Sequence, residues 1–458
     1  MRTERDTLGE VQVPDDALYG AQTQRAVENY PISGLRAHPV FIRSFILLKR
    51  AAALANRELG TLDAALSDAI ARACDRLLGD DEGNRKHFPV DVFQAGAGTS
   101  FNMNVNEVIA NLANPSRGTY TPVHPNDHVN MAQSTNDVFP TAIRIATLLL
   151  LNELLPQLDA LVAAFDERGG AFKDVIKSGR THLQDAVPLT LGQEFHAYGS
   201  ATRRATRLLR DATNELRILG IGGTAVGTGM NAPRGYRQIV VRQLNEMTNL
   251  DLTATDDLRE AMQSQLPVSA VSGALRNLAL ELTRITNDLR LLASGPQTGL
   301  AEITLPSVQP GSSIMPGKVN PSMLECMNHV LFHIIGSATT IDCAVQAGQL
   351  ELNVMMPLMT FEILFSIEIL KNYLPLFIEK CIRGIEADRA QCEAYYISSP
   401  SLATALNPII GYARAAEIAK ESAKSGTPIP QLLREKKILS EDEIARIFTP
   451  EFLAGQAD

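Results

Sequence analysis

The stretch "PVSAVSGALRNLALELTRITNDLRLLASG", residues 267–295, has the pattern of a single long helix. Its apolar side chains recur every three or four residues, which places them along one side of a helix of about seven turns. These positions are Val271, Ala274, Leu275, Leu278, Leu282, Ile285, Leu289 and Leu292. Pro267 opens the pattern and Gly295 closes it, as is common at helix ends. A helix of this length needs neighbours on several faces, so the stretch predicts a bundle of long helices.

Four further segments share this periodicity and lack the alternation of strands: residues 136–170, 188–219, 321–347 and 353–385. Together the five segments predict an all-α fold with a central long-helix bundle that is shared between subunits. The flanking regions hold shorter elements that are interrupted by Gly, Pro and Asn. We therefore predict an N-terminal domain over 1–135, a central helical-bundle domain over 136–390 and a small helical domain over 391–458.

The composition of the 458-residue chain excludes several classes of protein. The net charge is -9 and no run of Lys or Arg is dense, so nucleic acid and anionic membranes are not expected partners. The five cysteines are widely spaced and include no CxxC pair, which disfavours disulfides and a thiolate zinc site. The most apolar stretch, residues 146–165, is interrupted by Asn152, Glu153, Pro156 and Asp159, and the start of the chain is charged. These features predict a cytoplasmic protein without a membrane span.

Small polar residues crowd together in four stretches between the long helices. These stretches are "GAGTSFNMNVNEV" (96–108), "HPNDHVNMAQSTNDVFPTA" (124–142), "GRTHLQDAVPLTLGQEF" (179–195) and "GSSIMPGKVNPSMLE" (311–325). Taken singly they have a structural explanation, because Thr99, Ser134, Asn136 and Thr181 could cap helices. Taken together they supply hydroxyls, amides and the compact positive charge of Lys318, which is the set of groups that binds a small dicarboxylate.

Three other motifs suggest a cofactor or a metal. "GTGMNA" (227–232) matches a dinucleotide fingerprint, but a helical pattern precedes it where a strand is required. His329 and His333 share one helix face among apolar neighbours, which favours core histidines over metal ligands. The segment from His124 to His128 could bind a metal or form a capped turn, and the sequence leaves both open. We expect neither a metal nor a cofactor.

The segment "GSSIMPGKVNP" (311–321) closely resembles the signature of the fumarase/aspartase superfamily. The other three polar stretches match that family in the same order, and the likeness extends from "ERDTLGEVQVPDDALYGAQTQRAVEN" (4–29) to "TALNPIIGYARAAEIAK" (404–420). The resemblance implies a three-domain all-α subunit, a homotetramer with a central helical core and active sites that are each built from three subunits. It also implies anti elimination across a succinyl skeleton to give fumarate.

Within that superfamily the chain mixes features of two branches. "HPND" (124–127) and "GAQTQR" (20–25) are similar to class II fumarases, whereas "QSTND" (133–137), "YPISG" (30–34) and "AGQLELNVMMP" (347–357) are similar to aspartases. The balance favours elimination of ammonia from L-aspartate, with the hydration of fumarate to L-malate as the alternative. An inactive binding protein is disfavoured because the residues that the reaction needs are present.

The resemblance assigns roles to eleven residues. Thr99, Ser134, Thr135 and Ser313 would hold the β-carboxylate; Lys318 and Asn320 would bind the α-carboxylate; Asn136, Thr181 and His182 would surround the amino group. Ser312 would be the base that removes the proton, and Glu325 would orient His182. A serine is a weak base, so its alkoxide needs stabilisation, which we expect from Lys318 and from backbone N–H groups at Gly311 and Gly317.

Overall fold

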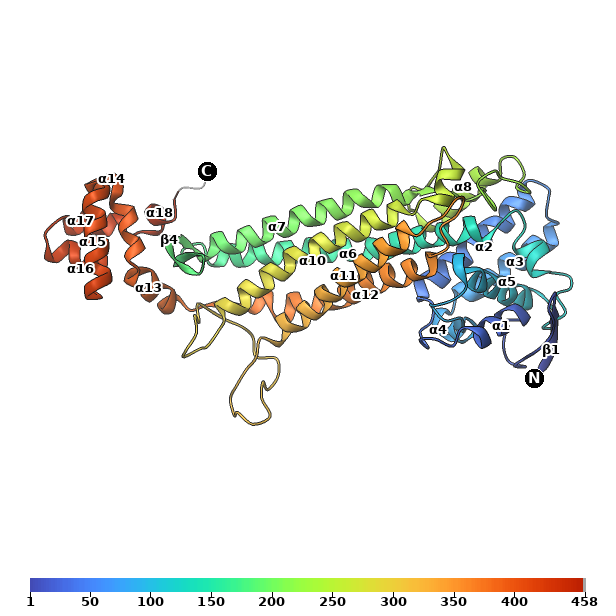
Figure 1. Cartoon of the computed structure of the whole chain (residues 1–458), viewed down its shortest axis with the longest axis horizontal. Helices are drawn as coiled ribbons and strands as arrows, with labels where there is room; N and C mark the ends of the chain where they lie inside the picture. Colours follow the sequence, from blue (N-terminus) through green and yellow to red (C-terminus); the bar gives the residue numbers. More distant parts are fainter. Residues whose placement is uncertain (456–458) are drawn as a thin grey trace. The chain divides into compact units, whose positions relative to one another are not determined.

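The computed structural model describes residues 1–455 and is mainly helical (Figure 1). The chain divides into two compact units, which are described separately below. Unit 1 comprises residues 1–155, 207–279 and 332–371, and unit 2 comprises residues 156–206, 280–331 and 372–458. The predicted boundaries of the three domains stay a prediction, because the two compact units divide the chain at other residues.

Five long helices lie where the sequence predicts them. They are α6 (Thr135–Ala171), α7 (Leu191–Ala212), α10 (Leu266–Leu292), α11 (Ser322–Gln346) and α12 (Met356–Lys380). Helices α7 and α12 are shorter than expected: the 3-10 turn η4 (Thr213–Arg217) and the short strand β5 (Ile218–Leu219) follow α7, and the 3-10 turn η5 (Ile382–Gly384) follows α12. The helical period in the sequence therefore located the long elements, while a local change of helix type follows two of them.

Polar side chains link neighbouring long helices inside each unit. In unit 1 these pairs are Ser269–Asp342 between α10 and α11, Ser337–Glu362 between α11 and α12, and Lys371–Glu153 between α12 and α6. In unit 2 they are Arg203–Asp166 between α7 and α6, Thr286–Asn328 between α10 and α11, and Tyr373–Met323 between α12 and α11. Within each unit the long helices therefore pack side by side, as a bundle does.

The remaining helices of unit 1 are short to medium in length. They are α1 (Ala21–Asn29), α2 (Pro39–Glu58), α3 (Ala64–Leu78), α4 (Asp81–Asn84), α5 (Thr99–Ala113), α8 (Tyr236–Thr248) and α9 (Leu258–Gln263), with the 3-10 turns η1 (Arg85–His87) and η2 (Gly96–Gly98) and the π-helical turn η3 (Pro125–Val129). Helices α2, α5 and α6 meet in an aromatic cluster of Phe41, Phe45, Phe101 and Phe139, with ring centroids 5.0–5.6 Å apart. Such buried rings contribute both apolar area and a defined geometry.

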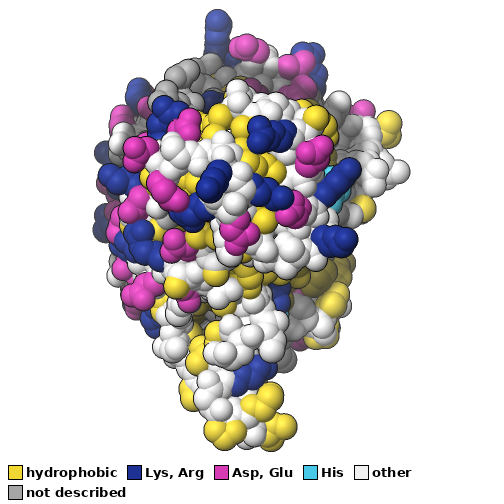
Figure 2. Space-filling view, turned by 90° about the vertical axis from the view of Figure 1, so that its left-hand side faces the viewer, with side chains coloured by type: hydrophobic (Ala, Val, Ile, Leu, Met, Phe, Trp, Pro, Cys, Tyr) yellow, Lys and Arg dark blue, Asp and Glu magenta, His cyan; other side chains and the backbone are white. Residues whose placement is uncertain are grey.

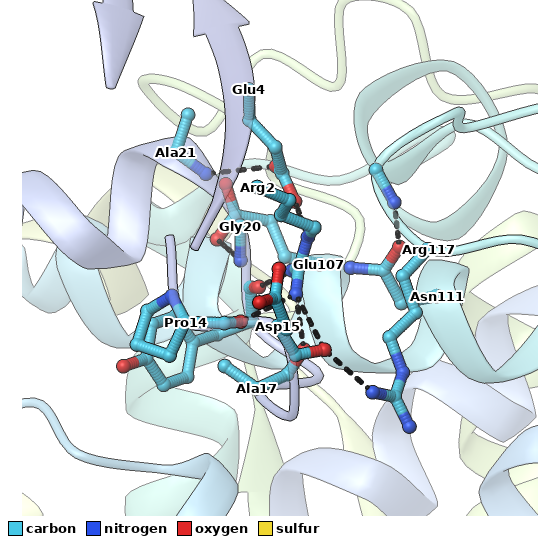
Figure 3. A network of polar contacts seen from close by, with 12 residues as sticks. Arg2, Glu4, Pro14, Asp15, Ala17, Gly20, Ala21, Glu107, Asn111 and Arg117 are labelled. Carbon is cyan, nitrogen blue, oxygen red and sulfur yellow. Dashed lines mark hydrogen bonds and ion pairs between the residues drawn. The ribbon is translucent and has the colours of Figure 1, made fainter. Parts of the chain in front are cut away.

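A buried acid fixes the start of α1 in unit 1 (Figure 3). Glu107 on α5 accepts a hydrogen bond from the N–H group of Gly20 at 2.8 Å. It also accepts from the N–H of Gln22 at 2.9 Å and from the hydroxyl of Thr23 at 2.6 Å. Burial raises the pKa of Glu107. Beside it, Glu4 accepts from the Ala21 N–H and from the Tyr120 hydroxyl. The segment "GAQTQR" is thus anchored by carboxylates at the positive end of a helix.

The strands form four two-stranded pairs, which the sequence analysis did not predict. They are β1 (Arg2–Asp6) with β2 (Gly9–Val13), β3 (Ile176–Thr181) with β4 (Gln184–Thr190), β5 with β6 (Thr253–Ala254), and β7 (Ile303–Thr304) with β8 (Glu386–Ala387). Each strand is short, and the third polar stretch conceals β3 and β4 because it lacks regular alternation.

The C-terminal helices of unit 2 have a core of their own. They are α13 (Arg389–Ser398), α14 (Asn407–Ile410), α15 (Tyr412–Ser425), α16 (Ile429–Glu435), α17 (Glu441–Ile447) and α18 (Pro450–Leu453), with η5 (Ile382–Gly384) and η6 (Pro400–Leu406). Leu402, Leu406, Ile429 and Leu433 are buried in one cluster. Figure 2 looks onto these helices and shows basic and acidic side chains interspersed on this face.

Helix α6 is long and apolar enough to cross a membrane by length and composition alone. However, 78% of its most apolar window is buried inside the structure. This burial is typical of the core helix of a folded domain.

Gly98 provides a test of the aromatic cluster. It has a φ of +83°, and a Cβ there would lie 2.0 Å from Cε2 of Phe139. We expect Gly98→Ala to lower the free energy of unfolding by roughly 1–3 kcal/mol, because the ring and the backbone must both shift. The matched control is Gly170→Ala on α6, where a Cβ meets nothing within 4 Å, and which should gain about 0.5–1 kcal/mol. The thermal unfolding midpoints of both variants test this prediction, and equal midpoints would contradict it.

Candidate active site

The eleven predicted site residues divide between the two units. Unit 1 holds Thr99, Ser134, Thr135 and Asn136; unit 2 holds Thr181, His182, Ser312, Ser313, Lys318, Asn320 and Glu325. The unit 1 residues lie at the starts of α5 and α6. In unit 2, Thr181 and His182 lie on the β3–β4 hairpin, whereas the other five residues lie on the 311–321 loop or at the start of α11.

The first group in unit 1 lies at the start of α6. The hydroxyl of Ser134 accepts the Asn136 N–H at 3.3 Å, so the capping interpretation holds for Ser134. The hydroxyl oxygen of Thr135, which is 8% exposed, accepts a hydrogen bond from the Asn102 amide on α5 at 3.1 Å. The Asn136 amide donates to the carbonyl of Ala225 at 2.8 Å, so Asn136 is not a cap.

Thr99 occupies the first turn of α5 and is exposed. The cap position is Gly98, and the free N–H of Phe101 in the first turn is accepted by the side chain of Gln94 at 3.0 Å, so the capping interpretation was wrong for Thr99. The Thr99 hydroxyl therefore does not cap the start of α5. The contact between Asn102 and Thr135 places the starts of α5 and α6 close together, and two helix N-termini favour negative charge.

Asp137 is a buried acid that the sequence analysis missed. Its carboxylate accepts from the N–H groups of Ser134 at 2.9 Å and of Gly222 and Thr224 at 3.0 Å. Burial raises the pKa of Asp137 to about 6. These bonds hold the loop that precedes "GTGMNA" against the start of α6, so this glycine-rich segment has a structural role.

In unit 2, His182 lies at the tip of the β3–β4 hairpin. Thr181 pairs with Gln184, which leaves His182 and Leu183 as a two-residue turn with φ values of +56° and +57°. This sign pattern is that of a type I′ turn, where Asn and Gly are preferred. Holding two side-chain-bearing residues there costs about 1 kcal/mol or more each, and such strain concentrates at functional sites. Thr181 is in a strand, so its predicted capping role was wrong.

Buried charges hold the base of this hairpin. The Arg180 guanidinium donates to both oxygens of Glu302 at 3.0 Å, and the Lys177 ammonium lies 3.1 Å from Glu302 and 2.9 Å from Glu194. Glu302 is fully buried. Two cations around one buried carboxylate fix the strand immediately before Thr181 and His182.

The signature loop (residues 311–321) is closed by its own hydrogen bonds. The Gly311 N–H donates to the Lys318 carbonyl at 2.8 Å, and the Asn320 amide donates to the Gly311 carbonyl at 2.6 Å. A Cβ on Gly311 would lie 2.6 Å from the Lys318 oxygen, so only glycine fits there. One of the two amide protons of Asn320 is left for another acceptor. The loop extends beyond the helices of unit 2 in Figure 1, and Ser313 and Lys318 are exposed.

Backbone N–H groups do converge on the Ser312 oxygen, although not those that were predicted. The donors are Ile314 at 3.2 Å and Met315 at 2.9 Å. Gly311 donates to Lys318 instead, and Gly317 supplies a positive φ of +80° at the turn. The expected arrangement was therefore wrong in its donors, because the chain turns back directly after Ser312.

Glu325 lies in the first turn of α11, with a carboxylate oxygen 4.0 Å from Arg290. Within the residues that the structure describes, no hydrogen bond joins Glu325 to His182. Their pairing stays a prediction.

The other histidines differ from expectation in part. His329 and His333 are exposed, so the core interpretation was wrong, and His333 contacts the Ser337 hydroxyl at 3.2 Å. His124 and His128 each accept a backbone N–H through Nδ1. Of the two interpretations of that segment, the structure favours the capped turn.

A fully buried lysine, Lys49 on α2, was also missed. Its ammonium donates to the side-chain oxygens of Asn102, Asn130 and Gln133. The available signal was a charged residue within the apolar run "FILLKRAAALA" (45–55), since lysine is almost never fully buried unless paired. A mainly apolar cavity of about 290 Å³ in unit 1, lined by Phe41 and Phe101 and also by Arg36, His38 and Arg85, holds none of the predicted site residues.

Comparisons with known proteins agree along nearly the whole chain. Residues 9–336 match the family described as Lyase, and residues 402–455 match the Fumarase C C-terminus. An aspartate ammonia-lyase of Helicobacter pylori is 46% identical over 457 residues (98% of this chain, 97% of that protein), and one of Bacillus subtilis is 46% identical over 454 residues (98% and 95%).

Solved structures give the same result. A fumarate lyase/delta crystallin of Brucella melitensis bound to cobalt has a TM-score of 0.95 at 46% identity, covering 99% of this chain and 100% of that one. A class II fumarase of Schistosoma mansoni has a TM-score of 0.95 at 35% identity, with 100% of both chains covered.

Glu302 allows the hairpin anchor to be tested. Glu302→Gln removes the carboxylate that pairs with Arg180 and leaves Lys177 with Glu194 alone, so we expect the free energy of unfolding to fall by roughly 3–5 kcal/mol. Glu58→Gln removes one partner of the exposed pair with Arg242, and should cost only about 0–1 kcal/mol. Guanidinium unfolding compares the two variants. Equal losses in the free energy of unfolding would mean that the buried cluster stabilises the protein no more than an exposed ion pair does.

Proposed function

Because the chain belongs to the fumarase/aspartase superfamily of lyases, we propose that it catalyses the elimination of ammonia from L-aspartate to give fumarate. The observation that carries this assignment is the 46% identity to several aspartate ammonia-lyases over nearly their full length. The hydroxyls of "QSTND" at the start of α6 suit a dicarboxylate substrate, which both candidate reactions share. Fumarate hydratase is the second candidate, supported by the structural likeness to a class II fumarase.

The chemical obstacle to this reaction is the negative charge that its intermediate carries. Removing the proton from C3 places a second negative charge on the β-carboxylate, and the intermediate then expels the amino group from C2 to form the double bond. Preorganised donors that meet this charge lower the barrier most. Thr99, Ser134 and Thr135 would supply them, and the adjacent starts of α5 and α6 add a favourable field.

Ser312 would take the proton. Two N–H groups directed at its oxygen, at 3.2 and 2.9 Å, favour an alkoxide over the neutral hydroxyl. Lys318 and Asn320 on the same loop would bind the α-carboxylate, which lies next to the carbon that loses the amino group. Thr181, His182 and Asn136 would surround that amino group, with Glu325 orienting His182, and Ser313 would assist at the β-carboxylate.

We further propose a cytoplasmic homotetramer in which three subunits build each active site. Its support is an apolar surface on the long helices that a single chain leaves open: Phe332 is 54% exposed, Leu280 51% and Leu376 46%. Large side chains of this kind along helix faces indicate burial against other subunits.

Substrate choice tests the activity. L-aspartate and L-malate share both carboxylates, so only groups that face the leaving group can separate them. We expect fumarate, followed by its ultraviolet absorbance, to form far faster from L-aspartate than from L-malate, and D-aspartate to be rejected. Comparable or faster turnover of L-malate would assign the chain to the fumarases.

Subunit mixing tests the shared site. We expect His182→Ala and Ser312→Ala to be nearly inactive separately, with rates reduced by about 10²–10⁴. If these residues meet across a subunit boundary, exchanged mixtures of the two variants should recover part of the activity. A mixture that demonstrably exchanges and remains inactive would place each site within one chain.

A further inference from the structure

Lys49 lies in the middle of α2 and is completely buried. Its ammonium donates to Oδ1 of Asn102 at 2.8 Å, Oδ1 of Asn130 at 2.9 Å and Oε1 of Gln133 at 2.9 Å. An ammonium has three protons and no acceptor, so this set satisfies it completely. All three partners are neutral, which is an unusual way to bury a charge.

Stability alone gives a poor account of this arrangement. Burying an ammonium without a paired carboxylate costs free energy, and an apolar side chain of similar size would avoid that cost. Burial lowers the pKa of Lys49 to about 7, with the charge of Asp137 acting in the opposite direction. A group retained at such a cost beside the start of α6 suggests a functional role.

The ammonium fixes the direction of the amides around it. Because Lys49 can only donate, the oxygen of Asn102 must face it, and the amide NH₂ must point the other way. That NH₂ donates to Oγ1 of Thr135 at 3.1 Å. The same constraint orients Gln133, whose NH₂ donates to the Val129 carbonyl at 3.0 Å. Without the ammonium, the longer bond from the Asn102 NH₂ to Oδ1 of Asn130 at 3.3 Å would be left to oppose a half-turn of the amide.

The orientation of the Asn102 amide also determines how the Thr135 hydroxyl can form hydrogen bonds. Since its oxygen accepts from Asn102, its own proton is available to donate, and it donates to no acceptor among residues 1–455. Thr135 is one of the hydroxyls assigned to the β-carboxylate. A donor whose proton is not engaged elsewhere is available when negative charge develops.

We propose that Lys49 is a positioning residue that acts through Asn102 to present the Thr135 proton to the substrate carboxylate. This proposal rests on the proposed function, because it assumes that a carboxylate binds at Thr135. The contact strengthens as the carboxylate gains its second charge, so its loss should lower kcat more than it raises KM.

Asn102→Asp is the sharpest test. The new carboxylate keeps the shape of the side chain and pairs with Lys49, but it has no N–H for Thr135 and instead attracts the Thr135 proton. We expect kcat to fall about 100-fold, with KM changed less than about three-fold and the unfolding midpoint maintained. Retention of kcat within about three-fold of the wild type would overturn the proposal.

Asn104→Asp is the matched control on the same helix. Asn104 is also buried, but its amide donates to the His87 carbonyl at 2.9 Å and takes no part in the chain from Lys49 to Thr135. This variant should lose stability and keep kcat within about three-fold. A loss of kcat equal to that of Asn102→Asp would mean that any charge buried in α5 inactivates the enzyme, and would overturn the proposal.

A double-mutant cycle isolates the route through Thr135. Lys49→Met and Thr135→Val should each lower kcat, and the double variant should be no more than about three-fold below the worse single variant. Independent, multiplying effects would show that Lys49 does not act through Thr135. The cycle is measured on whichever dicarboxylate the wild type converts, so a failure on L-aspartate contradicts the proposed function alone.

Discussion

The apolar faces of five long helices can leave water only by packing against one another, and the rest of the structure follows from this constraint. A bundle interior built mainly from Leu, Ile and Val offers few hydrogen-bonding partners, so most clusters of polar residues lie at helix ends and in the segments between them. The polar stretches lie at those places, at the starts of α5, α6, α7 and α11. The predicted site residues therefore lie at or near the ends of helices and not in the middle of the bundle.

Charges that are nevertheless buried act as anchors around those helix ends. Glu107 holds the start of α1, Asp137 holds a glycine-rich loop on α6, and Glu302 holds the hairpin of His182 through Arg180 and Lys177. Each carboxylate is surrounded by donors, as burial requires. Lys49 differs from these buried carboxylates because it is a buried cation whose hydrogen-bond partners are neutral amides. Its charge is thus left to orient its neighbours instead of being neutralised by them.

The sequence predicted the long helices well because their period is repeated over many turns and depends on no single residue. It did not predict the β3–β4 hairpin, since the positive φ values at His182 and Leu183 are imposed by the surrounding fold and not by the usual Asn-Gly signal. It also misjudged His329 and His333, which are exposed together with Phe332 while Leu331 and Ile334 are buried. Lys49 could have been noticed as a charge in an apolar run, but its partners lie 53 to 84 positions away and only folding brings them together.

The two parts of the proposed chemistry differ in how rigidly they are held. Thr135 is buried and oriented by a chain of hydrogen bonds, whereas Ser312 lies on a loop whose residues 313–319 are exposed and ordered by contacts within the loop. Two N–H donors stabilise an alkoxide weakly while water competes for it, and strongly once water is excluded. Ser312, as the proposed base, would therefore be most effective when water is excluded from the loop. A covering surface from a neighbouring subunit, or the substrate itself, would make proton removal conditional on assembly and binding, which protects a reactive alkoxide from solvent at other times.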